Sequence, residues 1–213
     1  MRLSIYDDAG IMPTDSNEYE LLREATLMAA SISGAGCEIG VRRGGGSRAI
    51  MEAFIDAGVN KTHIMVDPWG DIPYLTTEGN RVVLPTDYTN EMRSQFFVDL
   101  GVWSQGKNVN PVVINLTDED FFLLYANGVP TYVDKQRIVE TNYCLVHLDG
   151  PHSSEPVNRE AEWFAPRMLP GAMLVCDDIE GYYDHWEKSD PYIRSLGFEP
   201  YKRGRHKAVY RRK

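Results

Sequence analysis

Three aspartates that follow two apolar runs are the residues of this chain most suited to chemistry. Asp149 ends the run LVHLD, and the pair Asp177 and Asp178 ends the run AMLVCDD. If the two runs form neighbouring parallel strands, their carboxyl ends open on one crevice, where open α/β sheets bind ligands. Carboxylate oxygens suit a hard divalent cation such as Mg²⁺. The sequence therefore predicts a metal site built from these three side chains, although each aspartate alone could equally be a helix cap or a loop residue.

A histidine three residues after the first aspartate is a candidate general base. Neutral imidazole suits proton abstraction near neutral pH, so His152 could take the proton of a hydroxyl polarised beside Asp149. In the alternative interpretation His152 orders the turn or contacts a cofactor. His147, inside the preceding apolar run, is expected to alternate into packing.

A glycine-rich turn and a distant acid are typical of a nucleotide site. The segment CEIGVRRGGGS places Glu38 and Gly40 at the end of one strand and three glycines before a helix that starts at Ser47. Glycine lets a ligand approach the backbone, and a helix N-terminus offers free N–H groups. Asp67 ends the next strand, where an acid can accept the ribose hydroxyls. A glycine-rich turn alone could be a tight connection, but with Asp67 it predicts an adenosine-containing cofactor.

The acid within the turn favours one such cofactor over another. Dinucleotide sites present G-x-G-x-x-G to a pyrophosphate, whereas here Glu38 precedes the first glycine by two positions and Gly44, Gly45 and Gly46 are bunched. A carboxylate facing the ligand would repel a pyrophosphate and would suit the cationic amino-acid end of S-adenosylmethionine. An NAD-dependent oxidoreductase and a non-catalytic cofactor-binding protein are the alternatives.

From Gly34 to Cys176 the order of these motifs resembles class I S-adenosylmethionine-dependent methyltransferases. The resemblance is to the cation-dependent O-methyltransferases, of the catechol type and the macrocin sugar type, with their D-G-x-H-S relatives. It implies metal-assisted methylation of a small-molecule hydroxyl on a sugar or phenol. The implied cofactor residues are Glu38, Gly40, Gly44, Gly46, Ser47, Asp67, Thr117 and Asp118. The implied metal ligands are Asp149, Asp177 and Asp178.

The resemblance also bears on the catalytic base. The sugar-type relatives use an aspartate two residues after the first metal ligand, and Pro151 stands at that position here. The catechol-type relatives carry a lysine where this chain has His152. His152 and Asp149 are therefore the catalytic candidates.

A βα rhythm along the chain predicts the elements that position these residues. It indicates an α/β, Rossmann-like, seven-stranded mostly parallel sheet with helices on both faces and a C-terminal antiparallel hairpin. The expected strands are 36–40, 63–66, 111–115, 143–148, 172–176, 198–202 and 208–211. The expected helices are 16–32, 47–57, 90–100, one capped by Thr117 and Asp118, and 155–168.

The chain is expected to form a single domain over residues 1–213, with a helical extension at 1–33. Residues 70–90 lack a period and contain many Gly, Pro and Thr residues, so they are expected to form an insertion or lid loop. Trp69, Tyr74 and Tyr88 lie on or beside this loop and could cover a sugar or ring, although packing is an equal alternative.

Bulk properties limit the partners. A net charge of −9 argues against nucleic acids and anionic membranes, which leaves a small-molecule acceptor and an undetermined homo-oligomer. The basic C-terminal residues are expected to protect a solvated edge strand or to attract an anionic substrate. They are Lys202, Arg203, Arg205, Lys207, Arg211, Arg212 and Lys213. Three unpaired cysteines, with neither a leader nor an apolar span, predict a cytoplasmic protein.

Overall fold

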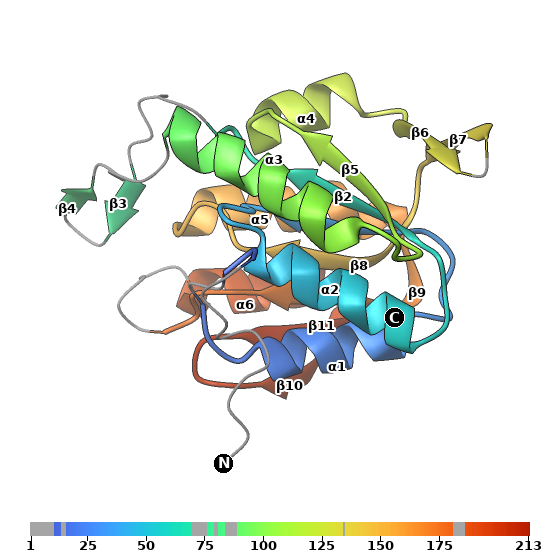
Figure 1. Cartoon of the computed structure of the whole chain (residues 1–213). Coiled ribbons are helices and arrows are strands. Elements are labelled where there is room, and N and C mark those ends of the chain that lie inside the picture. The colour runs from blue at the N-terminus through green and yellow to red at the C-terminus, as the bar shows by residue number, and fades with distance from the viewer. Residues whose placement is uncertain are drawn as a thin grey trace, which may run out of the picture.

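The central element of the fold is a twisted seven-stranded sheet (Figure 1). The computed structural model describes residues 11–13, 16–69, 76–78, 81–83, 89–133, 135–180 and 186–213. In spatial order the strands are β10 (Phe198–Arg203), β11 (Ala208–Arg212), β9 (Met168–Cys176), β8 (Tyr143–Leu148), β1 (Ala35–Ile39), β2 (Thr62–Val66) and β5 (Asn110–Ile114). The strands from β9 to β5 are parallel, and β11 is antiparallel to both of its neighbours. The predicted fold class is confirmed.

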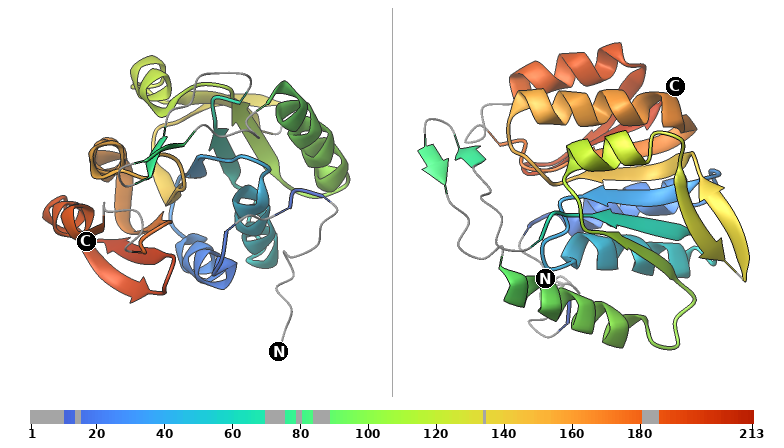
Figure 2. Two further views of the ribbon diagram at one scale, coloured as in Figure 1. Left: turned by 90° about the vertical axis from the view of Figure 1, so that its left-hand side faces the viewer. Right: turned by 90° about the horizontal axis from the view of Figure 1, so that it is seen from above.

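Helices cover both faces of this sheet, which gives three layers (Figures 1 and 2). One face carries α1 (Tyr19–Ala29), α2 (Gly45–Asp56) and α3 (Asn90–Ser104), and the other carries α4 (Asp118–Leu124), α5 (Ser154–Phe164) and α6 (Trp186–Ser195). Because both faces are covered, β1, β2 and β8 are buried at every position. The short 3₁₀ turn η1 (Ala165–Arg167) joins α5 to β9.

Three features of the fold differ from the sequence prediction. A hairpin of β6 (Val129–Val133) and β7 (Gln136–Glu140) was missed, as was α6, which contains a proline. The segment 70–90, expected as an insertion or lid loop, contains a hairpin of β3 (Thr76–Glu78) and β4 (Arg81–Val83). This hairpin lies on the side where the parallel strands end (Figure 2). Residues 70–75, 79–80 and 84–88, and with them Tyr74 and Tyr88, fall outside the described residues.

Hydrogen bonds beyond the strand ends hold the connecting loops side by side. The bonds Gly40 N to Val66 O (3.0 Å), Asp149 N to Ile39 O (2.9 Å) and Asp177 N to Leu148 O (2.9 Å) continue the pairing of four adjacent strands. The residues that follow β2, β1, β8 and β9 therefore meet at one edge of the sheet. This edge faces left in Figure 1 and faces the viewer in the left panel of Figure 2.

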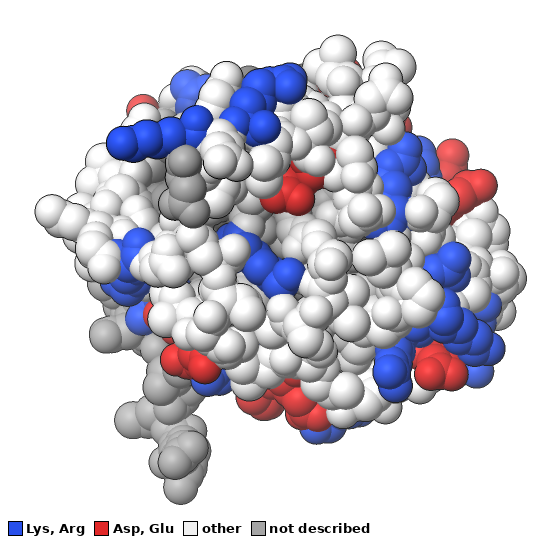
Figure 3. All heavy atoms as spheres, turned by 90° about the vertical axis from the view of Figure 1, so that its right-hand side faces the viewer, with Lys and Arg blue, Asp and Glu red and all other residues white. Residues whose placement is uncertain are grey.

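Cys37, Cys144 and Cys176 are buried free thiols inside strands, as predicted. No helix in the described part of the chain is long and apolar enough to cross a membrane. On the side opposite the carboxyl ends of the parallel strands, acidic and basic side chains are interspersed among uncharged ones (Figure 3).

Candidate functional site

The turn after β1 is built over a buried carboxylate. Glu38 is 1% exposed, and its side chain accepts a hydrogen bond from Ser47 Oγ and lies 2.8 Å from His147 Nδ1. A Cβ at Gly46 would lie 2.0 Å from Glu38 Oε1, so the first turn of α2 closes over the carboxylate. Glu38 was expected to face a ligand, but its carboxylate instead faces the turn, where polar partners offset its burial. Its contact with a cofactor stays a prediction.

Two further glycines give this turn its close approach to the neighbouring strand end. Gly40 has a φ of +82° and Gly44 a φ of +88°. A residue with a side chain would be strained at these positive φ values. A Cβ at Gly40 would lie 2.1 Å from the carbonyl oxygen of Asp149, and one at Gly44 would lie 2.6 Å from Met12 Cε. The predicted glycine-dependent turn is present. Its contact with a cofactor stays a prediction.

Asp67 ties the end of β2 to the same turn. Its Oδ2 accepts hydrogen bonds from the backbone N–H groups of Val41 and Arg42, both at 2.8 Å, and its Oδ1 accepts one from Trp69 N at 3.0 Å. Trp69 is itself buried, stacked on Phe96 with ring centroids 4.7 Å apart. A carboxylate has about four acceptor positions, so one remains for a ligand hydroxyl. Asp67 thus shapes the turn, and the ribose contact stays a prediction.

The buried Asp67 should make the stability of the protein depend on pH. Burial raises the pKa of Asp67 to about 6, although the three N–H donors act to lower it. A raised pKa in the folded state means that this group's stabilisation is fully present below about pH 4 and is lost as pH rises through about 6. The difference between this pKa and the ordinary value of an aspartate corresponds to roughly 3 kcal/mol. We expect the difference in unfolding free energy between wild type and Asp67→Asn to decrease by this order between pH 4 and 7. Urea titrations along that series would show it, and a difference independent of pH would contradict it.

The adenine candidates after β5 have structural partners at the start of α4. Thr117 is the N-cap, because its Oγ1 accepts a hydrogen bond from Asp120 N at 3.1 Å. Asp118 Oδ2 accepts a hydrogen bond from Arg159 at 2.8 Å. The predicted cap is confirmed. No further observation places adenine there, so that role of Thr117 and Asp118 stays a prediction.

A chain of buried polar side chains crosses the strands just beneath the site. His147 Nδ1 contacts Glu38, and His147 Nε2 lies 3.9 Å from Asp177 Oδ2 and has no hydrogen-bond partner among the described residues. At the other end, His63 Nε2 lies 2.9 Å from Ser47 Oγ, and burial lowers the pKa of His63 to about 3. His147 was expected to be a packing residue. It instead links the glycine turn to the acidic end, which the alternation of β8 alone could not reveal.

The three predicted metal ligands all follow strands that end at this edge of the sheet, but two of them already have a lysine or histidine partner. Asp177 is buried and accepts hydrogen bonds from Lys207 Nζ and Ser16 Oγ. Asp178, at φ +54°, has its Oδ2 2.6 Å from His152 Nδ1. Asp149 is partly exposed as a whole residue, but the burial of its carboxyl group, together with the nearby Asp177 carboxylate, holds its pKa well above the ordinary value. The predicted catalytic pair His152 and Asp149 thus lies at the acidic end.

These residues do not fit an Mg²⁺ ion as they are arranged. Among the described residues, the acidic, histidine or cysteine side chains whose ligand atoms lie within 4.8 Å of one another are Glu38, His147 and Asp149, not the three predicted carboxylates. The side chains of Glu38 and His147 are hydrogen-bonded to each other and almost fully buried. Mg²⁺ requires oxygen ligands in near-octahedral order and retains several waters. Metal binding therefore stays a prediction to which the arrangement gives no support.

The basic C-terminal segment differs from the prediction at one residue, Lys207. Lys202, Arg203 and Arg205 are exposed, as a charged edge strand requires, but Lys207 is completely buried. The burial follows from its ion pair with Asp177. No local pattern in the sequence indicates this pairing, because 30 residues separate Lys207 from its partner.

The geometry combines a glycine turn, an acid after β2 and an acidic end after β8 and β9, and the comparison with known families agrees with it. Residues 37–179 match the model of a family described as a methyltransferase domain. This chain belongs to the methyltransferase domain family. It is a class I S-adenosylmethionine-dependent methyltransferase, as its motifs predicted. No functionally curated protein matches the sequence.

Solved structures share the fold of this methyltransferase at low sequence identity. The calicheamicin methyltransferase CalS11 has a TM-score of 0.61 and 12% identity, over 91% of this chain and 77% of that one. The O-methyltransferase NovP has a TM-score of 0.56 and 15% identity, over 92% and 79%. Cofactor-bound Rv0187 from MTB has a TM-score of 0.60 and 14% identity, over 97% and 85%. At these identities the likeness supports the fold alone.

Proposed function

We propose that this methyltransferase transfers the methyl group of S-adenosylmethionine to a hydroxyl of a small molecule, a sugar or a phenol. The observation that carries the proposal is the arrangement at the sheet edge. The glycine turn and Asp67 lie beside a strand end that carries Asp149, and the hydrogen bonds between strands hold the two parts together. One fold neighbour, NovP, is named as an O-methyltransferase, and another, CalS11, as a TDP-rhamnose 3'-O-methyltransferase, which supports an oxygen acceptor.

The reaction needs a cofactor end and an acceptor end on one line. The hydroxyl oxygen of the acceptor attacks the sulfonium methyl, the S–CH₃ bond breaks as the O–CH₃ bond forms, and the hydroxyl proton leaves. Holding both partners in line supplies much of the acceleration. His152 is the proposed proton acceptor, since its ring lies at the acidic end and is held 2.6 Å from Asp178 Oδ2. The Asp178 carboxylate would stabilise the imidazolium that forms.

If His152 is the general base, its replacement should slow methyl transfer without weakening cofactor binding. His152→Gln should lower the rate of methyl transfer by about 10²-fold or more, because general bases contribute 10²–10⁴-fold, while the affinity for S-adenosylhomocysteine should change little. The assay uses S-adenosylmethionine with a labelled methyl group and a panel of sugars, nucleotide sugars and phenols. Equal rates for wild type and variant on an accepted substrate would remove His152 from the mechanism.

A non-catalytic cofactor-binding protein is the remaining alternative. It is favoured by the contact of Lys207 with Asp177, which takes up part of the acidic end. Such a protein would bind S-adenosylhomocysteine and transfer no methyl group to any member of the panel. We further propose a cytoplasmic location, which the three buried free thiols support, and action on small molecules rather than nucleic acids or membranes. A homo-oligomer stays a prediction, for which gel filtration with light scattering is the measurement.

A further inference from the structure

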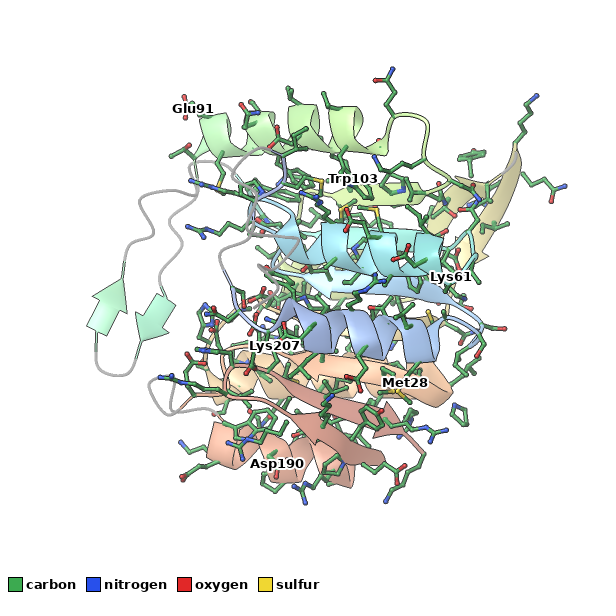
Figure 4. All side chains as sticks on the ribbon, turned by 60° about the horizontal axis from the view of Figure 1, so that its bottom comes forward. Met28, Lys61, Glu91, Trp103, Asp190 and Lys207 are labelled. Atoms are coloured by element: carbon green, nitrogen blue, oxygen red, sulfur yellow. The ribbon has the colours of Figure 1, made fainter. Side chains whose placement is uncertain are left out.

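Lys207 is a buried cation inside the acidic end of the site. Its side chain is 0% exposed, and its Nζ donates hydrogen bonds to Asp177 Oδ2 and to Ser16 Oγ, the latter at 2.7 Å. The ring centroid of Tyr19 lies 5.0 Å from Nζ. A lysine ammonium has three donors, and these three neighbours match them. Figure 4 shows Lys207 beside the start of α1, at the end where the parallel strands terminate.

The position of Lys207 is fixed by a clamp from the N-terminal segment. Glu18 accepts hydrogen bonds from three successive backbone N–H groups, those of Arg205 (2.8 Å), His206 (2.9 Å) and Lys207 (3.0 Å). A Cβ at Gly204 would lie 2.1 Å from Glu18 Oε2, so the turn before β11 is tightly closed on this carboxylate. Such a clamp leaves the lysine little freedom to withdraw from Asp177.

The acceptor positions of Asp177 are largely taken. Its Oδ2 accepts from Lys207 Nζ and from Ser16 Oγ, and its Oδ1 accepts from the N–H of Asp178 at 2.9 Å. Of about four lone-pair positions on a carboxylate, one is left. The Lys207 charge also acts to lower the pKa of Asp149, whereas burial and the neighbouring acids raise it.

We infer that the Lys207 ammonium is the resident cation of the acidic end and holds the place on Asp177 that a divalent ion would need. The inference rests on the proposed function and specifies its cofactor requirement: one organic cofactor and no divalent ion at Asp177. A lysine is a compact point charge, so it can neutralise a buried carboxylate without the octahedral shell of Mg²⁺. Lys207 then acts as a positioning residue, because it orders Asp177 and through it the loop that carries Asp178.

The test uses Mn²⁺ as a paramagnetic probe on the full ¹⁵N-labelled chain. Mn²⁺ broadens the amide signals of residues close to its binding site. For wild type we expect no selective broadening around Asp149 and Asp177. Selective broadening there, at Mn²⁺ concentrations below that of the protein, would overturn the inference without any variant being needed.

Two variants sharpen this test. Lys207→Met frees Asp177, so the folded variant should gain Mn²⁺ broadening around residues 149 and 177, and Lys207→Met/Asp177→Asn should lose it again. A folded Lys207→Met variant that gains none would also overturn the inference. Calorimetry with S-adenosylhomocysteine on the same wild-type sample, with and without EDTA, keeps the two proposals apart. If S-adenosylhomocysteine does not bind, the proposed function is contradicted. If it binds and EDTA abolishes the binding, only the inference about Lys207 is contradicted.

Discussion

Lys207→Met should lower the free energy of unfolding by about 3–5 kcal/mol, the cost of leaving one partner of a buried ion pair alone. Lys207 and Asp177 are both almost fully buried. Among the described residues, Asp177 would keep hydrogen bonds from the Ser16 hydroxyl and the Asp178 N–H, with His147 Nε2 at 3.9 Å. Burial acts to raise the pKa of Asp177, but the charges of Lys207 and His147 outweigh it and hold the pKa below its ordinary value. Urea unfolding at neutral pH, followed by tryptophan fluorescence, measures the loss.

Two control variants test whether the loss of stability comes from the Asp177 carboxylate that is left buried without its cation. Lys207→Met/Asp177→Asn removes both charges and should recover most of the stability, because neither group is then buried unpaired. Lys202→Met removes a lysine from a pair with Glu24 at 2.5 Å in which both side chains are well exposed, and it should change the stability little. A Lys207→Met variant as stable as Lys202→Met would contradict the burial of Lys207.

Gly40→Ala should have the second large effect, a fall of about 2–5 kcal/mol in the free energy of unfolding together with loss of S-adenosylhomocysteine binding. Two costs add at this position. A residue other than glycine at φ +82° costs roughly 1–2 kcal/mol, and a Cβ that meets a backbone carbonyl adds overpacking of about 1–3 kcal/mol. The carbonyl belongs to Asp149, whose N–H is bonded to Ile39 O, so it cannot move aside without breaking the pairing of β1 and β8.

Two other glycines separate these costs. Gly58 has φ +70° and open space where a Cβ would be, so Gly58→Ala should show the conformational cost alone, about 1 kcal/mol. Gly101 lies within α3 with open space and no positive φ, so Gly101→Ala should stabilise the protein by about 0.5–1 kcal/mol. A Gly40→Ala loss no larger than that of Gly58→Ala would show that the close approach of Gly40 to Asp149 does not exist in solution.

Much of the fold follows from local patterns in the sequence. The strand Tyr143–Leu148 was predicted with its observed bounds, and the other strands of the main sheet were predicted within a few residues, because buried apolar runs between turn signals define them. The hairpin of β6 and β7 was missed because its exposed positions carry residues such as Tyr132 and Val139, which blur the alternation. In α6, Pro191 interrupts the helical signal.

The candidate site was predictable in its composition and less so in its contacts. Gly40, Asp67 and Asp149 lie where strand ends place them, because the position of a residue after a parallel strand fixes the edge of the sheet that it occupies. The direction of the Glu38 carboxylate depends on Ser47 and on His147, which comes from a distant strand. The burial of Lys207 depends on Ser16 and Glu18 at the other end of the chain. Such contacts between distant segments leave no local pattern to read.

The most direct test of the central claim is isothermal titration of the wild-type protein with S-adenosylhomocysteine, alongside Asp67→Asn and NAD⁺. The predicted result is one-to-one binding of S-adenosylhomocysteine to wild type, clearly weaker binding to the folded Asp67→Asn variant, and no binding of NAD⁺. Asp67 supports the turn through the N–H groups of Val41 and Arg42, so its change should reach the cofactor even without a direct contact. A folded wild-type protein that binds NAD⁺ and not S-adenosylhomocysteine would contradict the assignment as a methyltransferase.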